Sequence, residues 1–287
     1  MSYEIKLLHE LEMSCSDKQL IHASKYLNKQ YNVFIPDNQL WTMIKNIFGE
    51  DFYDIFDKYS NYMIANKFIN ILLLKYYPCE RTLKYYLANS FKGKNDIIAF
   101  EIPSINSRVD MCRFNTHSYA YEIKTEFDNF KRLEKQIKDY SMLFEYVYVV
   151  IPISYLSNLE KIIPYYCGIK TYIFDNKIKL TTYRKAILSP NINPAFQLNN
   201  LSTNDIKYIY DKHNITKKIP SSKEDRINFL LNKYSAKTIN FDFKMTLKSA
   251  HLKKWAFIKE NISDILPIDI QSFYKNTMSP SLIYMHE

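Results

Sequence analysis

The chain has 287 residues, of which 47% are hydrophobic and 16% are aromatic, and its formal net charge is +9. This composition supports a sizeable folded core and excludes an intrinsically disordered chain. Three glycines exclude a glycine-rich phosphate loop, and four scattered cysteines without a Cys-x-x-Cys pair argue against a structural zinc site or a disulfide framework.

Residues 1–76 are expected to form a helical N-terminal lobe. Ser16 and Gln19 predict a capping box, and the apolar residues that follow recur at helical spacing as far as Tyr76. The opening segment is too acidic and too broken for a signal peptide, and no apolar run reaches the roughly 18 residues that span a bilayer. We therefore expect a cytoplasmic protein without a membrane partner.

Residues 77–187 have an alternating helix and strand pattern. A helix from Glu80 precedes the strand-like runs "DIIAFEI", "RVDMCRF" and "SYAYEIK". Next come the helix "NFKRLEKQIKDYSML", the strand "YVYVVIP", a helix near 155–166 and a closing hairpin, "IKTYIFDNKIKLTTY". This order predicts an α/β core with a mixed sheet flanked by helices. His117 falls in the turn between the second and third strands, and we interpret it as an ordinary turn residue.

After a proline-containing linker, residues 196–287 are expected to form a basic helical C-terminal lobe of short helices, one opened by a capping box of Ser221 and Glu224. Residues 201–260 hold 13 Lys and Arg against 6 Asp and Glu, a net charge of +7. A basic segment of this kind attracts polyanions, chiefly nucleic acid. It can also serve only to keep a protein soluble, and composition leaves both interpretations open.

Three charged residues lie in runs that otherwise favour buried strands: Asp110, Glu122 and Lys124. Side chains alternate faces along a strand, so antiparallel pairing of the two runs brings Asp110 near Glu122, on the face opposite their apolar neighbours. The alternative is a solvent-facing sheet surface with a cross-strand ion pair.

Two further polar residues are suited to join this group. In the helix after the third strand, Gln136 interrupts the apolar stripe that should face the sheet, where an amide requires partners. Glu80 opens the helix before the sheet; there the helix dipole favours an acidic side chain, and from there it can reach the sheet edge.

This order of residues resembles the PD-(D/E)XK nuclease superfamily, with its restriction-endonuclease-like α/β core. The segment "YEIKTEFDNFKRLEKQIKDYSMLFEYVYVVIP" is similar to a little-characterised bacterial group in which YEIK is followed by an Arg-Leu-x-x-Gln helix. The resemblance covers about residues 80–152. The residue before Asp110 is Val109 and not the proline that names the superfamily, a change that removes no ligand.

The resemblance implies a catalytic set of Asp110, Glu122, Lys124 and Gln136. It implies Mg²⁺ or Mn²⁺ as cofactor, held by Asp110, Glu122 and the main-chain carbonyl of Ile123, with Glu80 as an additional or outer ligand. These oxygens are hard ligands of the kind that such ions prefer. Arg108 and Tyr140 are expected to contact nucleic acid or to support the site.

The C-terminal segment "LSTNDIKYIYDKHNITKKIPSSKEDRINFLLNKY" resembles helix-extended-helix DNA-binding modules. The resemblance implies that Lys217, Lys218, Lys223 and Arg226 meet phosphates. A solvated helical face is the alternative.

We therefore expect a metal-dependent endonuclease that hydrolyses nucleic-acid phosphodiesters, with DNA favoured over RNA. A non-catalytic DNA-binding or regulatory protein that retains the nuclease fold is the alternative from another class, and a protein–protein adaptor is a third. The sequence leaves open whether the protein acts as a homodimer or with a partner protein.

Overall fold

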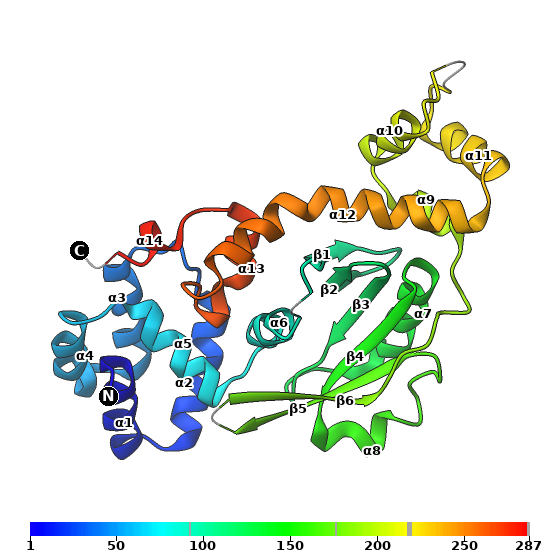
Figure 1. Ribbon diagram of the computed structural model, residues 1–287. Coiled ribbons are helices and arrows are strands. Elements are labelled where there is room, and N and C mark those ends of the chain that lie inside the picture. Colours follow the sequence, from blue (N-terminus) through cyan, green and yellow to red (C-terminus); the bar gives the residue numbers. More distant parts are fainter. Residues whose placement is uncertain (92, 176, 217–219, 286–287) are drawn as a thin grey trace. The chain divides into compact units, whose positions relative to one another are not determined.

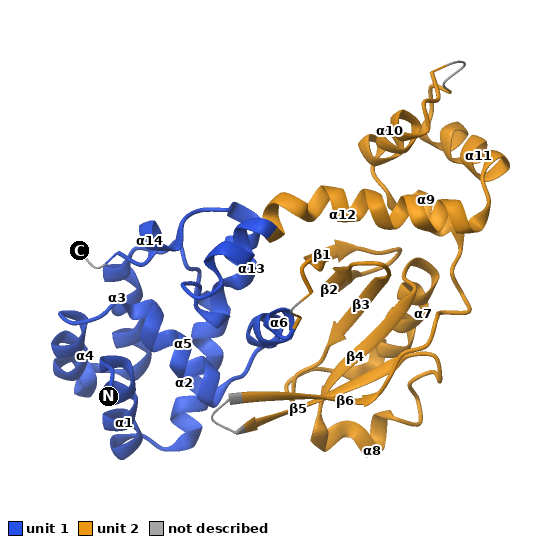
Figure 2. Cartoon of the chain, in the orientation of Figure 1, with its two compact units in different colours: residues 1–90, 256–287 blue, residues 91–255 orange. Residues whose placement is uncertain are grey.

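The computed structural model describes residues 1–91, 93–175, 177–216 and 220–285, which form two compact units (Figure 2). One unit contains residues 1–90 and 256–287, and the other contains residues 91–255. The helices of the first unit are α1 (Tyr3–Ser14), α2 (Asp17–Gln30), α3 (Asp37–Phe48), α4 (Tyr53–Ser60), α5 (Ala65–Tyr76), α6 (Glu80–Asn89), α13 (Ile270–Asn276) and α14 (Pro280–Ile283), with the short 3-10 helices η1 (Glu50–Phe52) and η4 (Pro267–Asp269).

The second unit contains the sheet, whose strands and helices are labelled in Figure 1. The long helix α12 (Ala236–Asn261) begins in this unit and ends in the first. Its strands are β1 (Ile97–Pro103), β2 (Arg108–Phe114), β3 (Ser118–Ile123), β4 (Tyr146–Pro152), β5 (Gly168–Asp175) and β6 (Lys177–Arg184). Its helices are α7 (Leu133–Leu143), α8 (Leu156–Leu159), α9 (Pro194–Asn200), α10 (Thr203–Lys212) and α11 (Lys223–Lys233), with η2 (Phe130–Arg132) and η3 (Ile153–Tyr155).

The two units divide the chain differently from the three predicted parts, because α6 and the last residues join the N-terminal helices. In that unit the buried carboxylate of Asp269 accepts hydrogen bonds from the hydroxyls of Tyr31, at 3.0 Å, and Tyr284, at 2.7 Å. Arg81 of α6 donates to the main-chain carbonyl of Asn28 in α2. Residues from both ends of the sequence thus build one core.

The first unit is centred on α5, whose sequence ANKFINILLLKY is apolar on most of its circumference. A helix of this kind buries its surface on several sides, and α1, α2 and α3 pack against α5. The rings of Trp41, Phe56 and Phe68 lie with their centroids 6.1 to 6.4 Å apart in the core. The prediction of a helical N-terminal region is confirmed, as is the capping box of Ser16 and Gln19.

The second unit is built on a six-stranded mixed sheet in which the strands lie in chain order, from β1 to β6. Strands β1, β2 and β3 are antiparallel neighbours, β3, β4 and β5 are parallel, and β5 and β6 form the closing hairpin. Helix α7 connects β3 to β4 and packs against both. The predicted α/β fold class and the predicted order of elements are confirmed, with helical regions before and after the core.

Three details differ from the predictions. The helix expected near 155–166 is limited to α8, and the chain then turns ahead of Pro164. The capping side chain of α11 is Ser222, which accepts from the N–H of Asp225, so the capping pair lies one residue after the predicted Ser221 and Glu224. The C-terminal region contains the 26-residue α12 in addition to short helices.

Helix α12 is fixed to the sheet of the second unit by a buried charged group. The ammonium of Lys244 lies 3.3 Å from the carboxylate of Glu145, which also accepts from the N–H of Ser118 at 2.6 Å. Burial opposes ionisation of Glu145, but these donors outweigh it and hold the pKa of the carboxyl below its usual value. The C-terminal helical region therefore shares the core of the sheet.

Across the described ranges of the chain, no helix combines the length and the apolar character needed to cross a membrane.

Candidate functional site

Asp110 lies on β2 beside the end of β3. Its Oδ2 accepts a hydrogen bond of 2.7 Å from the main-chain N–H of Ile123. The β2–β3 register pairs Met111 with Tyr121, so its next step sets Asp110 opposite Glu122. The expected proximity of the two strand segments is thus present in the structure.

Glu122 is 1% exposed, and Lys124 is its cationic partner. The Lys124 Nζ lies 2.6 Å from Oε1 of Glu122 and 3.1 Å from Oε1 of Gln136 on α7. A buried carboxylate is stable only with such partners, because the loss of water around a charge is costly. The predicted residues Glu122, Lys124 and Gln136 therefore form one hydrogen-bonded group.

Tyr140, one turn after Gln136 on α7, completes the surroundings of Glu122. Its hydroxyl lies 2.8 Å from Oε2 of Glu122 and 2.7 Å from the main-chain carbonyl of Arg108. One hydroxyl proton can serve only one of these acceptors at a time. Burial, and then the negative charge of Glu122, raise the pKa of Tyr140, so the hydroxyl remains protonated. Tyr140 thus connects α7 to the ends of both strands.

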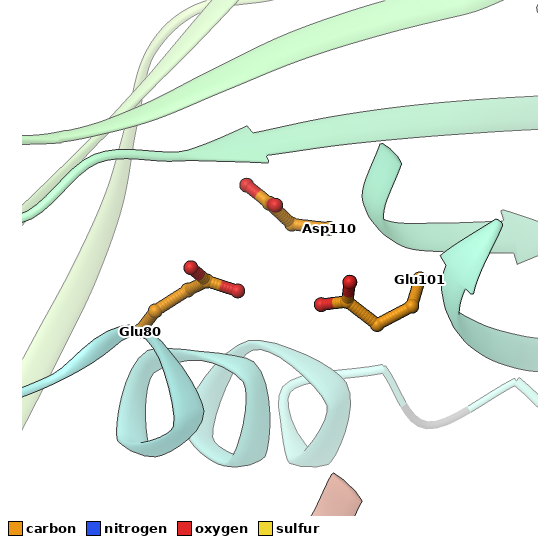
Figure 3. A group of neighbouring side chains, drawn as sticks. All are labelled: Glu80, Glu101 and Asp110. Atoms are coloured by element: carbon orange, nitrogen blue, oxygen red, sulfur yellow. The ribbon is translucent and has the colours of Figure 1, made fainter. Parts of the chain in front are cut away.

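Glu101 is a residue of this region that the sequence reasoning missed. The pairs Phe100–Met111 and Ile102–Val109 set Glu101 on β1 opposite Asp110 on β2, and a carboxylate oxygen of one lies within 4.8 Å of one of the other. Figure 3 shows the two side chains, which come from neighbouring strands. A signal was available, because a glutamate interrupts the otherwise apolar run "IIAFEI".

The backbone of Glu101 has a φ of 57°, in the left-handed region that residues other than glycine rarely adopt. Such conformations cost free energy and persist where their surroundings enforce them, often at functional sites. Here the β1–β2 pairing continues on both sides of the residue. Arg108 reaches the same carboxylate, with its Nε 2.8 Å from Oε2 of Glu101, while its side chain stays 67% exposed.

Glu80, which Figure 3 also labels, belongs to the first unit, as the first residue of α6. Within that unit its Oε1 lies 2.5 Å from Nζ of Lys84, a fully buried lysine four residues later. Its expected role as a metal ligand stays a prediction.

Two of the basic residues predicted to meet phosphates, Lys223 and Arg226, lie in the first turn of α11. Lys223 donates to the main-chain carbonyl of Asn199 at 3.0 Å, and Arg226 donates through Nε to the carbonyl of Pro220 at 2.7 Å. These bonds leave the remaining donors of both side chains for a ligand. Lys217 and Lys218 lie outside the described residues.

The donor set of the second unit fits a divalent cation by its chemistry. Asp110, Glu101 and Glu122 supply carboxylate oxygens, which Mg²⁺ and Mn²⁺ favour. Oxygens of Asp110 and Glu101 lie within 4.8 Å of each other, whereas Glu122 belongs to no group of three such ligands that the described residues bring within this distance. Each carboxylate oxygen has two lone pairs, so the hydrogen bonds that Glu122 accepts leave capacity for a further partner. The carbonyl of Ile123, between Glu122 and Lys124, remains a predicted ligand.

The sequence of this chain is similar to that of one curated protein and to one family profile. It is 26% identical over 110 residues to "Protein cII" of Enterobacteria phage P4, a match that covers 38% of this chain and 42% of that protein. The chain thus spans about two fifths of the length of this curated relative. No solved structure gives a significant match. The profile of the family described as Bacteriophage P4 protein cII matches residues 80–273, which is more than half of the chain and includes all of the sheet. The chain therefore belongs to the Bacteriophage P4 protein cII family.

Proposed function

We propose that this protein is a metal-dependent endonuclease of the PD-(D/E)XK superfamily, with a restriction-endonuclease-like core in its second unit. One observation carries the proposal: Lys124 is bonded to Glu122 and Gln136, beside an Asp110 that is bonded to Ile123. An ordinary surface ion pair is exposed to solvent. Here the carboxylate of Glu122 is 1% exposed and also accepts a hydrogen bond from the hydroxyl of Tyr140. The order of strands and helices around these residues agrees with the same proposal.

The proposed cofactor is Mg²⁺ or Mn²⁺, held by Asp110, Glu122 and the carbonyl of Ile123, with Glu101 as a further candidate ligand. When bound, such an ion polarises a phosphodiester and lowers the pKa of a water. The side chains of the protein then have distinct tasks.

Lys124 supplies the positive charge of the site. Its ammonium has three donors, two of which are directed to Glu122 and Gln136, so a third remains for a phosphate oxygen or a water. Donors fixed in advance stabilise the charge that develops on the phosphate in the transition state. Gln136 and Tyr140 act as positioning residues, the first through Lys124 and the second through Glu122.

The proposed substrate is nucleic acid, with DNA favoured, and the proposed setting is the cytoplasm. The exposed guanidinium of Arg108 and the basic residues near α11 are the groups suited to phosphates. A homodimer or a partner protein remains compatible with this proposal.

A non-catalytic DNA-binding or regulatory protein is the second candidate. It is favoured by one observation, that both oxygens of Glu122 already accept hydrogen bonds, from Lys124 and from Tyr140. A hydrogen-bonded group of this kind can stabilise the fold without taking part in catalysis.

The deciding experiment incubates the purified chain with plasmid, linear duplex, single-stranded DNA and RNA, each with Mg²⁺, Mn²⁺ or EDTA. We expect cleavage with either ion, none in EDTA, and none in Asp110→Asn, which keeps an acceptor for the N–H of Ile123. Glu134→Gln, on the exposed side of α7, is the matched control and should cleave normally. A folded protein that binds duplex DNA but cleaves none of the four substrates would support the non-catalytic candidate, and full activity in EDTA would exclude the metal.

A further inference from the structure

A groove runs between α2 and α3 in the first unit, far along the chain from the residues of the proposed nuclease site. It encloses about 560 Å³, and His22, Tyr26, Gln39, Thr42 and Asn46 line it together with apolar side chains. A second hollow of about 230 Å³ shares His22 and Ile47 with it, so the two adjoin. The larger volume is within the range of clefts that take small organic groups.

Most of the polar lining of this groove is not used by the fold; the exception is Thr42, whose hydroxyl donates to the main-chain carbonyl of Asn38. Among the described residues, the side chains of His22, Tyr26, Gln39 and Asn46 form no hydrogen bond with the protein. The ring of Tyr26 is 47% exposed, and Met43 and Ile47 supply apolar surface beside it. Aromatic rings stack on bases, and amide side chains pair with base edges. The lining therefore has the chemistry that recognises an unpaired nucleobase.

The exposed side of α2 carries positive charge next to the groove. Lys18, Lys25 and Lys29 follow each other at seven and four residues, which places them on one helical face with His22 and Tyr26. All three lysines are exposed, and none forms an ion pair with a described acidic residue. We call these three lysines the α2 basic face. Lys18 also lines the second hollow, so the charge and the groove belong to one surface.

We propose that the groove between α2 and α3 binds an unpaired base of single-stranded nucleic acid, with the flanking phosphates on the α2 basic face. A positive surface beside an aromatic ring is the arrangement by which proteins hold single strands. An acidic peptide would explain the lysines, but it leaves the unpaired amides and the tyrosine ring without a role. The site lies in the first unit and uses none of the proposed catalytic residues, so it goes beyond the proposed nuclease activity.

The test measures binding by fluorescence anisotropy in EDTA, where cleavage plays no part, with a labelled single-stranded oligonucleotide and the matching duplex. Tyr26→Ala combined with Asn46→Ala should weaken single-strand binding about tenfold or more, since stacking on an aromatic side chain contributes this much. Duplex binding should change less than twofold. Tyr26→Phe keeps the ring and should retain the affinity, and circular dichroism verifies that each variant is folded.

Replacing Lys18, Lys25 and Lys29 by Gln should lower the salt dependence of single-strand binding, by about 0.7 in the log–log slope for each phosphate that is no longer neutralised. Tyr62→Ala is the control, because Tyr62 is 57% exposed in the same unit and does not line the groove. Unchanged single-strand binding in the Tyr26→Ala, Asn46→Ala variant would overturn the proposal, and so would an equal loss in Tyr62→Ala. The proposal would also be overturned if a poly-glutamate peptide competed for binding equally well in the unchanged protein and in Tyr26→Ala. That result would assign the lysines to an acidic protein partner.

The outcome is separate from that of the nuclease proposal. If Asp110→Asn loses cleavage but still binds single strands in the groove, the result bears only on the nuclease proposal for the second unit. If a groove variant loses single-strand binding but still cleaves a short duplex, the result bears only on the groove proposal for the first unit.

Discussion

The Nζ of Lys124 lies 2.6 Å from Oε1 of Glu122, two residues earlier in the chain. Glu122 is the last but one residue of β3, and Lys124 follows the strand, with its N–H bonded to the carbonyl of Val150 on β4. The two side chains meet because residues two positions apart on an extended backbone point to the same face of the sheet. The pair is buried, with side chains that are 2% and 12% exposed, so each charge depends on the other.

Replacement of Lys124 tests both the chemistry and this dependence. Lys124→Met should reduce cleavage by roughly two orders of magnitude, since it removes a donor proposed to act in the transition state. It should also lower the melting temperature, because removal of one partner from a buried ion pair costs about 3 to 5 kcal/mol. DNA affinity in EDTA should stay near that of the unchanged protein. Lys135→Met, on the exposed side of α7, is the control, and normal cleavage by Lys124→Met would return the pair to a structural role.

Tyr140→Phe should destabilise the protein by about 1 to 3 kcal/mol, because it removes a hydrogen bond to a buried charged group. The atoms concerned are Oε2 of Glu122 and the carbonyl of Arg108, which share the hydroxyl of Tyr140. Urea unfolding gives the free energy directly. Tyr165→Phe, at a tyrosine that is 71% exposed, should change nothing, and equal stability of the two variants would contradict the described contacts.

Asp269 should make the stability of the first unit depend on pH. Burial raises the pKa of this carboxyl from 3.8 to about 7, although the hydroxyls of Tyr284 and Tyr31 donate to it. Between these values the folded protein keeps a proton that the unfolded chain has lost. The contribution of Asp269 is therefore present at acidic pH, is lost as the pH rises toward 7, and is constant above that.

Asp269→Asn is neutral at every pH and should remove this slope, which amounts to a few kcal/mol at about 1.4 kcal/mol for each pKa unit. Urea unfolding at intervals from pH 4.5 to pH 8 measures it, with Asp264→Asn, at an exposed aspartate nearby, as the control. An identical slope in Asp269→Asn would show that the carboxyl is ionised in the folded protein.

The basic residues before and within α11 should govern the salt dependence of duplex binding. Replacing Lys217, Lys218 and Lys223 by Gln should lower the log–log slope by about 0.9 for each phosphate that the variant no longer neutralises, for all sequences alike. Arg226 is left unchanged because its Nε holds the carbonyl of Pro220. A variant with Gln at Lys6, Lys67 and Lys275 has the same net charge and should keep the slope; equal slopes in both variants would make this segment a solubilising face.

The sequence predicted the sheet because its signals are local. The turn at Asn115 to His117 separates two alternating strands, and the apolar stripe of α7 is interrupted only at Gln136. Helix α12 was not recognised as one long element. Its buried apolar residues are Ile239, Phe243, Leu247, Trp255 and Ile258, at intervals of four, four, eight and three positions. Each interval of four rotates the buried face by about 40°, which weakens a fixed stripe.

The sequence predicted those residues of the proposed site that can be identified from residue type and position in a strand, namely Asp110, Glu122 and Lys124. Glu101 was missed because its place depends on the β1–β2 register and on a left-handed backbone conformation, which is not encoded by a glycine or asparagine. The grouping of residues 256–287 with the N-terminal helices was also not predictable. It rests on contacts such as Tyr31 with Asp269, which are 238 positions apart.

The first unit is completed by residues 256–287, which the ribosome makes only after the whole sheet-bearing unit. During synthesis the second unit can therefore fold first, since domains fold as units while the chain grows. The N-terminal helices meanwhile expose the surface that later receives Ile270 and Phe273, both fully buried in the finished protein. The second unit can thus complete its fold before the first unit does, since the first gains its full set of contacts only once residues 256–287 have been made.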